Sequence, residues 1–183
     1  MKNTNILDEI RPTLKHKCNL EMLKYLEKFQ QRRVVTIDGN SFLQFVGRTK
    51  SDSMLLPLGK RRVFQLSFSP GAELLEFFHA FDGLREQEPP ETGNFVPAAQ
   101  IVTVTKALRP DYFPEFKDFA NCPIIFEATN GDQIVRTENG KFVWCVFSEH
   151  EIVDLADSFS QLLTQYIKFR AVGDGFPFDS YGR

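Results

Sequence analysis

The sequence predicts a fold that combines helices with antiparallel strands, the combination of the α+β class. Two Asn-Gly pairs, at 130–131 and 139–140, separate three β-rich runs, and turns of this kind join antiparallel strands. Apolar residues at helical spacing on both sides of that region predict amphipathic helices. A chain of 183 residues with 42% hydrophobic content can bury one core, so we expect one domain over 1–169 and a loosely held tail over 170–183.

The N-terminal third predicts helical segments followed by a hairpin. Apolar residues over 20–30 recur at three- and four-residue spacing, which predicts an amphipathic helix, and Pro12 ends a first turn or opens a helical piece because it cannot donate to a helical ladder. The runs around 38–39, an Asp-Gly pair, predict a hairpin, since glycine accepts the positive φ of a tight turn. The run 61–68, RRVFQLSF, predicts a further strand.

The segment 69–83, SPGAELLEFFHAFDG, predicts a helix whose aromatic side faces the core. Ser69 suits the cap, Pro70 the first helical position and Gly83 the left-handed residue that ends a helix. The expected apolar side is Leu74, Phe77, Phe78 and Phe81. The polar run over 85–94 then predicts an exposed acidic loop stiffened by two prolines.

The second half predicts a three-stranded antiparallel meander and a last helix. The run 98–105 is typical of a strand, and 109–120 of irregular or short helical structure broken by prolines. The meander strands are expected at 123–129, 132–138 and 141–147. The last helix is expected over 153–169, with Asp154 and Asp157 near its positive end, where carboxylates stabilise a helix.

Charge and composition narrow the classes of partner. The net charge is −2, with 22 basic and 24 acidic residues spread along the chain, so we expect no direct binding to nucleic acid. No run approaches the roughly 20 apolar residues of a membrane span, and charges interrupt the N-terminal segment where a secretory signal would be apolar. We therefore expect a cytoplasmic protein without membrane contact. An odd number of cysteines without a CxxC pair predicts buried, reduced thiols, which are Cys18, Cys122 and Cys145.

Catalytic and metal-binding patterns are missing from the sequence. The histidines have no ligand spacing, and there is no GxSxG, P-loop or GxGxxG run, so we expect no metal, no cofactor and no catalytic residues. Cys145 and His150 are the one pair that could act as nucleophile and base, which would make the chain a hydrolase. Cys145 lies in an alternating strand pattern, however, where a thiol is more often part of a core. We expect a protein that is not an enzyme.

With catalytic, metal and nucleic-acid sites not expected, the function that the sequence favours is binding to another protein. Aromatic residues anchor protein interfaces, and surrounding charges tune specificity and association rate. Two exposed segments offer such residues, the acidic loop and the aromatic run before Pro114. The residues that we expect to contact a partner are Glu86, Glu88, Glu91, Tyr112 and Phe113.

The order of these elements resembles the SMI1/KNR4 (SUKH) superfamily. The segment 70–84, PGAELLEFFHAFDGL, is similar to the early signature of that superfamily, a helix followed by Asn/Asp-Gly. The segment 124–167 resembles its C-terminal half: strand, polar turn, strand, tight glycine turn, strand and a helix with the phrase A-S-F-x-x-f-L. The residues that carry this phrase are Ala156, Asp157, Ser158, Phe159, Leu162 and Leu163. The matches cover 69–169.

The resemblance implies an α+β domain in which a mostly antiparallel sheet packs against helices. It also implies a binding role, because many bacterial members are similar to immunity proteins that neutralise a cognate toxin, often a nuclease or deaminase. Fungal relatives are regulators of signalling and the cell wall. We therefore expect an immunity protein whose partner is a toxin domain, with a regulatory or scaffold protein acting on a host complex as the alternative.

Overall fold

The fold is given by a computed structural model, which describes residues 6–48, 53–58, 66–87, 93–101 and 114–172. It contains helices and two antiparallel sheets, so the α+β class is confirmed. The helices are α1 (Ile6–Ile10), α2 (Lys17–Glu27), α3 (Ala72–Phe81) and α5 (Phe159–Val172). Short 3-10 segments lie at Arg11–Thr13, Ala98–Gln100 and Pro114–Phe119.

Within the described residues, the strands form one sheet of four strands and one of five, in chain order and antiparallel throughout. The first sheet contains β1 (Gln31–Ile37), β2 (Asn40–Val46), β3 (Met54–Pro57) and β4 (Arg85–Glu86). The second contains β5 (Gly93–Phe95), β6 (Ile124–Ala128), β7 (Gln133–Arg136), β8 (Phe142–Val146) and β9 (Glu151–Ala156).

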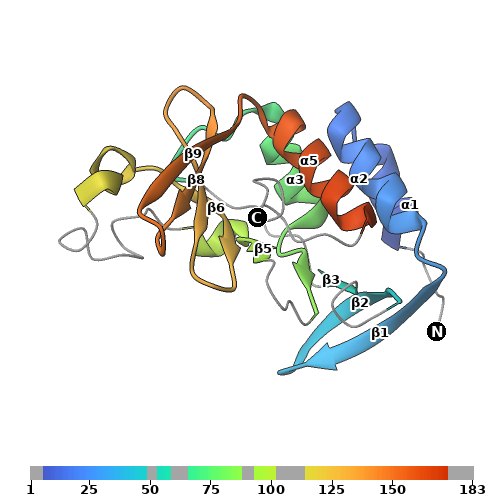
Figure 1. The fold of residues 1–183 in the computed structure, drawn as a ribbon. Helices are drawn as coiled ribbons and strands as arrows, with labels where there is room; N and C mark the ends of the chain where they lie inside the picture. The colour runs from blue at the N-terminus through green and yellow to red at the C-terminus, as the bar shows by residue number, and fades with distance from the viewer. Residues whose placement is uncertain (1–5, 49–52, 59–65, 88–92, 102–113, 173–183) are drawn as a thin grey trace.

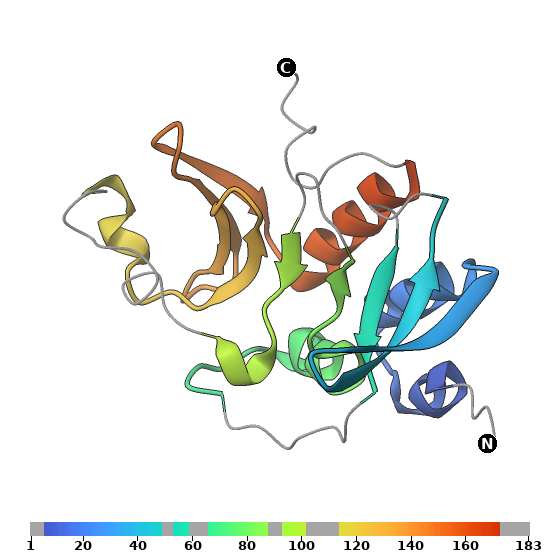
Figure 2. The same cartoon turned by 90° about the horizontal axis from the view of Figure 1, so that it is seen from below.

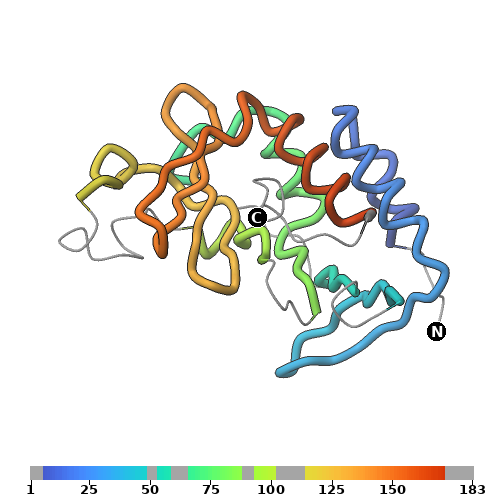
Figure 3. Tube along the Cα trace, in the orientation of Figure 1, coloured from blue at the N-terminus to red at the C-terminus, as the bar shows by residue number. Residues whose placement is uncertain are grey.

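The helices gather together, and the two sheets lie on different sides of them (Figure 1). The C-terminal helix α5 packs alongside α2, so the two ends of the described chain meet in the helical layer (Figure 3). The sheets approach each other at β4 and β5, which are neighbours in Figure 2. The Glu86 amide donates to the side-chain oxygen of Asn94 at 2.8 Å there, so a side chain bridges the two edge strands.

One hydrophobic cluster, with buried members from Leu7 to Tyr166, joins the helices to the inner faces of both sheets. Phe77 of α3 lies near its centre, with its ring centroid 4.7 Å from that of Phe95 and 5.2 Å from that of Phe159. Tilted and edge-on rings at these distances are favourable beyond the area that they bury. The expected aromatic side of this helix is confirmed, because Leu74, Phe77, Phe78 and Phe81 are all buried.

The tight turns agree with the sequence. Asp38 and Gly39 have φ of 51° and 77°, the left-handed pair that a two-residue hairpin needs, and they join β1 to β2. The predicted meander is confirmed as β6, β7 and β8. Gly83 has φ of 74° directly after α3, as expected of a residue that ends a helix.

Several predicted segments differ in the structure. The N-cap of α3 is Gly71, so Ser69 and Pro70 precede the helix instead of opening it. The predicted helix over 20–30 begins earlier, at Lys17, and ends at Glu27. Ala98–Gln100 is a 3-10 turn and not the start of a strand. The predicted strand at 61–68 lies mostly outside the described residues, and its described end, 66–68, is not a strand.

The last predicted helix was wrong at its start. The residues 151–156 pair with β8 as strand β9, because the free side of β8 is available to them and this pairing overrides the helical spacing of their apolar residues. The helix begins only at Phe159, where the Gln161 amide donates to Ser158 Oγ at 3.2 Å and Gln161 Oε1 accepts from the Asp157 amide at 3.0 Å. It continues to Val172, and Arg170 is buried, so the body of the protein extends beyond the predicted boundary at 169.

Hydrogen bonds to Glu76 of α3 hold the start of α2 against the core. Its carboxylate accepts from the backbone amides of Lys15 and His16 at 2.9 and 3.0 Å and from the Asn19 side chain at 3.0 Å. Burial raises the pKa of Glu76, but these hydrogen bonds outweigh it and hold the pKa below the ordinary 4.5. A depressed pKa stabilises the fold above the ordinary value, and this contribution is lost as the pH falls through the folded pKa.

Replacing Glu76 by alanine is therefore expected to lower the free energy of unfolding by about 2 kcal/mol at neutral pH. The difference from wild type should shrink in acid, because protonated Glu76 no longer favours the fold. Urea unfolding at neutral and acidic pH measures both quantities. Glu21→Ala, which removes only a surface ion pair with Lys17, is the control and should change stability by less than about 0.5 kcal/mol. An equal loss at both pH values would contradict the assignment.

Candidate functional site

The second sheet has apolar side chains on both faces. Its inner face contributes Phe126, Ile134 and Trp144 to the main core. Its outer face carries a second hydrophobic cluster with the buried members Phe116, Cys122, Ile124, Val135, Val143 and Cys145. This explains why every residue of β8 is buried, and why its sequence does not alternate in polarity.

The 3-10 segment Pro114–Phe119 covers part of this outer face. Phe116 is buried, and its ring meets that of Phe147 edge-on at 4.8 Å between centroids. The Cys122 amide then donates to the Phe119 carbonyl at 2.8 Å and leads the chain into β6. The expectation of short helical structure between 109 and 120 is thus confirmed for its described part.

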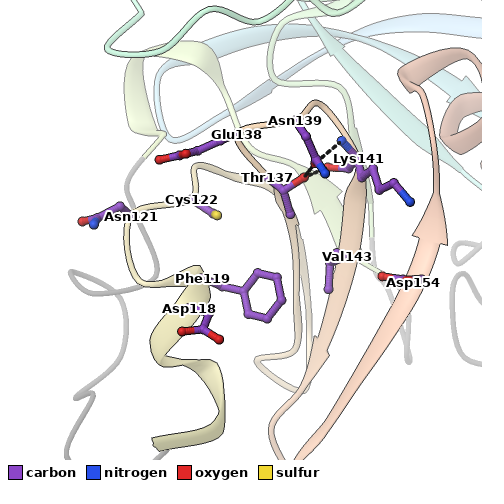
Figure 4. Close-up of a pocket in the computed structure, with 10 residues that line it drawn as sticks. All are labelled: Asp118, Phe119, Asn121, Cys122, Thr137, Glu138, Asn139, Lys141, Val143 and Asp154. Atoms are coloured by element: carbon purple, nitrogen blue, oxygen red, sulfur yellow. Dashed lines mark hydrogen bonds between the residues drawn. The ribbon is translucent and has the colours of Figure 1, made fainter.

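Beside this segment the outer face is hollowed, with a volume of about 570 Å³ (Figure 4). Its apolar lining consists of Phe119, Cys122 and Val143, and Figure 4 shows the Phe119 ring turned toward Val143. Its polar lining consists of Asp118, Asn121, Thr137, Glu138, Asn139, Lys141 and Asp154. We call this feature the acidic hollow.

Negative charge dominates the rim of the acidic hollow. The hollow is lined by three carboxylates, those of Asp118, Glu138 and Asp154, and by one lysine, Lys141. Lys141 Nζ lies 3.1 Å from the carboxylate of Asp157 outside the hollow. The hydrogen bond to Asp157 and the charges of Asp157 and Asp154 raise the pKa of Lys141. Part of the positive charge is therefore already matched, and the rim attracts cations.

The turn between β7 and β8 holds one wall of the acidic hollow in place. The Thr137 amide and hydroxyl both donate to the Lys141 carbonyl, at 2.9 and 3.1 Å, and Gly140 adopts φ of 87°. Figure 4 shows the Thr137, Asn139 and Lys141 contacts as one small network. A wall fixed by backbone contacts needs little reordering when a partner binds.

Of the residues predicted to contact a partner, Glu86 is described, and it is not on an exposed loop. It lies in β4 with its side chain fully buried, 3.2 Å from the Arg170 guanidinium, and the Tyr166 hydroxyl donates to it at 3.4 Å. Pairing with Arg170 makes the burial of a carboxylate possible, which the local acidic sequence does not indicate. The predicted contacts Glu88, Glu91, Tyr112 and Phe113 lie outside the described residues.

The alternative of a thiol hydrolase finds no support in the geometry. Cys145 is fully buried in the outer cluster, and burial together with nearby Cys122 and Asp132 raises the pKa of its thiol to about 12. A nucleophilic thiol needs access and partial ionisation at neutral pH. His150 is exposed, and its ring Nδ1 contacts the carboxylate of Glu115. Cys145 is a core residue, as expected, although β8 is buried on both faces and does not show the alternation expected from the sequence.

The sequence did not indicate the acidic hollow, because its residues come from three separate segments, 118–122, 137–143 and Asp154. Asp154 was assigned to a helix start, whereas it lies on β9 opposite Val143. Since directly paired residues share a face of the sheet, the pairing places this carboxylate beside the apolar lining. The apolar residues over 151–156 do not alternate, so no clear local signal indicated this strand.

In the described part of the chain, no group of three or more histidine, cysteine or acidic residues is placed to hold a metal ion. None of the described helices has both the length and the apolar character required to cross a membrane.

Comparisons with known proteins assign no family to this chain. No family model, no curated protein and no solved structure matches the chain.

Proposed function

We propose that this chain is a non-enzymatic protein-binding module, and that it acts in the cytoplasm as an immunity protein that neutralises a cognate bacterial toxin by direct binding. The resemblance to the SMI1/KNR4 superfamily suggests the class. The observation that carries the proposal is the acidic hollow, where apolar side chains lie beneath a rim of three carboxylates. Interfaces commonly join such an apolar centre to a charged rim.

The acidic hollow suits a lysine or arginine side chain of a partner. The aliphatic stem of that residue would contact Phe119 and Val143, while its charged end would meet Asp118, Glu138 or Asp154. An enzyme that acts on nucleic acid presents basic residues where it binds phosphates. A nuclease or deaminase toxin therefore offers the charge that this rim complements, and covering that surface would block its substrate.

The partner would first be captured with the tagged chain from its native lysate and identified by mass spectrometry. A toxin domain bound in a stoichiometric amount would support immunity, and its activity should fall when this chain is added. A resident signalling or cell-wall complex would instead favour the regulatory alternative.

Charge reversal then tests the surface itself. Glu138→Lys and Asp154→Lys are each expected to weaken toxin binding about tenfold or more, mainly through slower association, with unchanged thermal stability. Titration calorimetry and surface plasmon resonance measure affinity and rates. The matched control is Glu9→Lys, an exposed carboxylate on α1 away from the hollow. Equal affinity for wild type and both hollow variants would remove this surface from the proposal, and Glu88, Glu91, Tyr112 and Phe113 would be tested next.

A further inference from the structure

Strand β1 forms an edge of the first sheet. It pairs with β2 over seven residues without a bulge, and no described strand pairs with its other side. The β1–β2 hairpin lies at the periphery of the molecule in both views (Figures 1 and 2). An edge strand presents unpaired donors and acceptors that can accept another strand.

The hydrogen-bond pattern identifies which backbone groups face outward. The Ser41 carbonyl accepts from the Leu58 amide at 2.9 Å, so Ser41 directs its backbone toward the β3 side and away from β1. Thr36, which is paired with Ser41, must then direct its own backbone groups away from β2. By two-residue alternation the same holds for Val34 and Arg32. The outward backbone donors and acceptors of these three residues have no partner strand among the described residues.

The charged side chains of β1 do not protect this edge. The Arg32 guanidinium donates to the Glu27 carbonyl at 2.8 Å, and Arg33 Nε donates to Gln44 Oε1 at 2.5 Å, so both are held on their own molecule. Val34 follows the two arginines and is 63% exposed. The edge strand β9 of the second sheet differs, since its pairing contains a bulge and it carries Glu151 and Asp154 exposed.

We propose that the β1 edge binds the β1 edge of a second copy of this chain, antiparallel and centred on Val34. The outward groups of Arg32, Val34 and Thr36 allow about six backbone hydrogen bonds in this register. It sets Arg32 opposite Thr36 and Arg33 opposite Val35, so no two arginines of the copies face each other. The two Val34 side chains meet at the centre and cover each other. The first sheets of the two copies then form one continuous sheet across the dimer.

The strand itself favours a second copy over a foreign strand. A two-fold axis through Arg33 would place like charges opposite each other, and its backbone groups are directed toward β2. An axis through Arg32 would also oppose two arginines. An axis through Thr36 would pair only the last three residues of β1, so Val34 is the centre that pairs the whole strand without opposing two arginines.

Sedimentation velocity of the full chain over a range of concentrations tests the proposal. Wild type is expected to sediment as a dimer of twice the chain mass of 21.1 kDa. Val34→Lys should weaken dimerisation about a hundredfold, because two ammonium groups replace the central apolar contact, with unchanged circular dichroism and melting temperature. Ile152→Lys, at an exposed position of the β9 edge, is the matched control and should remain dimeric. A wild-type monomer at every concentration overturns the proposal, as does a dimer that Val34→Lys leaves intact. A monomer that binds a foreign protein through Val34 overturns it in favour of a foreign strand.

Oxidative cross-linking tests the register. Directly paired residues have Cα atoms about 5.5 Å apart, within the range of a disulfide, so Val34→Cys should give a covalent dimer. Thr36→Cys should give little, because Thr36 lies opposite Arg32 of the other copy and far from its own equivalent. The native cysteines are all buried, so they do not readily form disulfides in place of the introduced cysteine. Equal cross-linking of both variants, or of neither, overturns the register centred on Val34.

Discussion

Substitution of Gly93 by alanine is expected to lower the free energy of unfolding by about 3–5 kcal/mol. A Cβ at this position would lie 2.1 Å from the Glu127 carbonyl oxygen and 2.6 Å from the Ala128 Cα. Both atoms belong to the backbone of β6, so no side-chain rotation relieves the overlap. β5 would have to move away from β6, and the ring of Phe95 would leave its place against Phe77.

Gly131→Ala is the matched control for this result. Gly131 has φ of 92° and open space around its Cα, so alanine there meets only the backbone strain of a left-handed residue, about 1–2 kcal/mol. Denaturant unfolding of the two variants measures the difference. If both variants lost the same stability, the close approach of β5 to β6 would not be a feature of the folded protein.

Replacement of Glu86 by glutamine should also lower the free energy of unfolding by about 3–5 kcal/mol. The Glu86 and Arg170 side chains are 0% and 5% exposed, and their nearest charged atoms lie 3.2 Å apart. Removing one charge leaves the other in a medium that solvates it poorly. Burial and the negative charge of Glu86 raise the pKa of Tyr166 well above its ordinary value, so its hydroxyl stays protonated and can donate to this carboxylate.

The double variant Glu86→Leu with Arg170→Met separates charge from packing. Because a buried ion pair can be replaced by apolar residues at little cost, the double variant should recover most of the stability that Glu86→Gln loses. Thermal and urea unfolding of wild type and both variants measure the effect. Affinity for the proposed toxin partner should not change in variants that remain folded, since Glu86 is not at the surface. A double variant as unstable as Glu86→Gln would show that the pair acts through shape instead of charge.

Local sequence signals succeeded where one short segment determines the structure. The Asp-Gly and Asn-Gly turns fix the hairpin and the meander because few residue pairs accept left-handed φ. The aromatic side of α3 was predictable because helical spacing places Leu74, Phe77, Phe78 and Phe81 on one side. Cys145 was likewise predictable as a core residue from its position within a strand.

Local sequence signals failed where contact with a distant segment of the chain determines the secondary structure or the burial of a residue. The segment 151–156 has a composition that suits a helix or a strand, and pairing with β8 decides for the strand. Glu86 has the sequence context of an exposed acidic loop, but the Arg170 guanidinium, contributed by the end of α5, makes it a buried residue. The acidic hollow depends on Asp118, Glu138 and Asp154, which the chain brings together only after both β7–β8 and β8–β9 have paired.

The sequence by itself determined the α+β class, the turns, the aromatic helix and the absence of a catalytic motif, because each depends on residues within about ten positions of one another. Only the tertiary structure decided which charges are buried, which face of the second sheet is hollowed and which edge strand of the first sheet has no described partner. Those features depend on which distant segments meet. The packing of one shared core determines which segments come into contact, and no local sequence pattern specifies that packing.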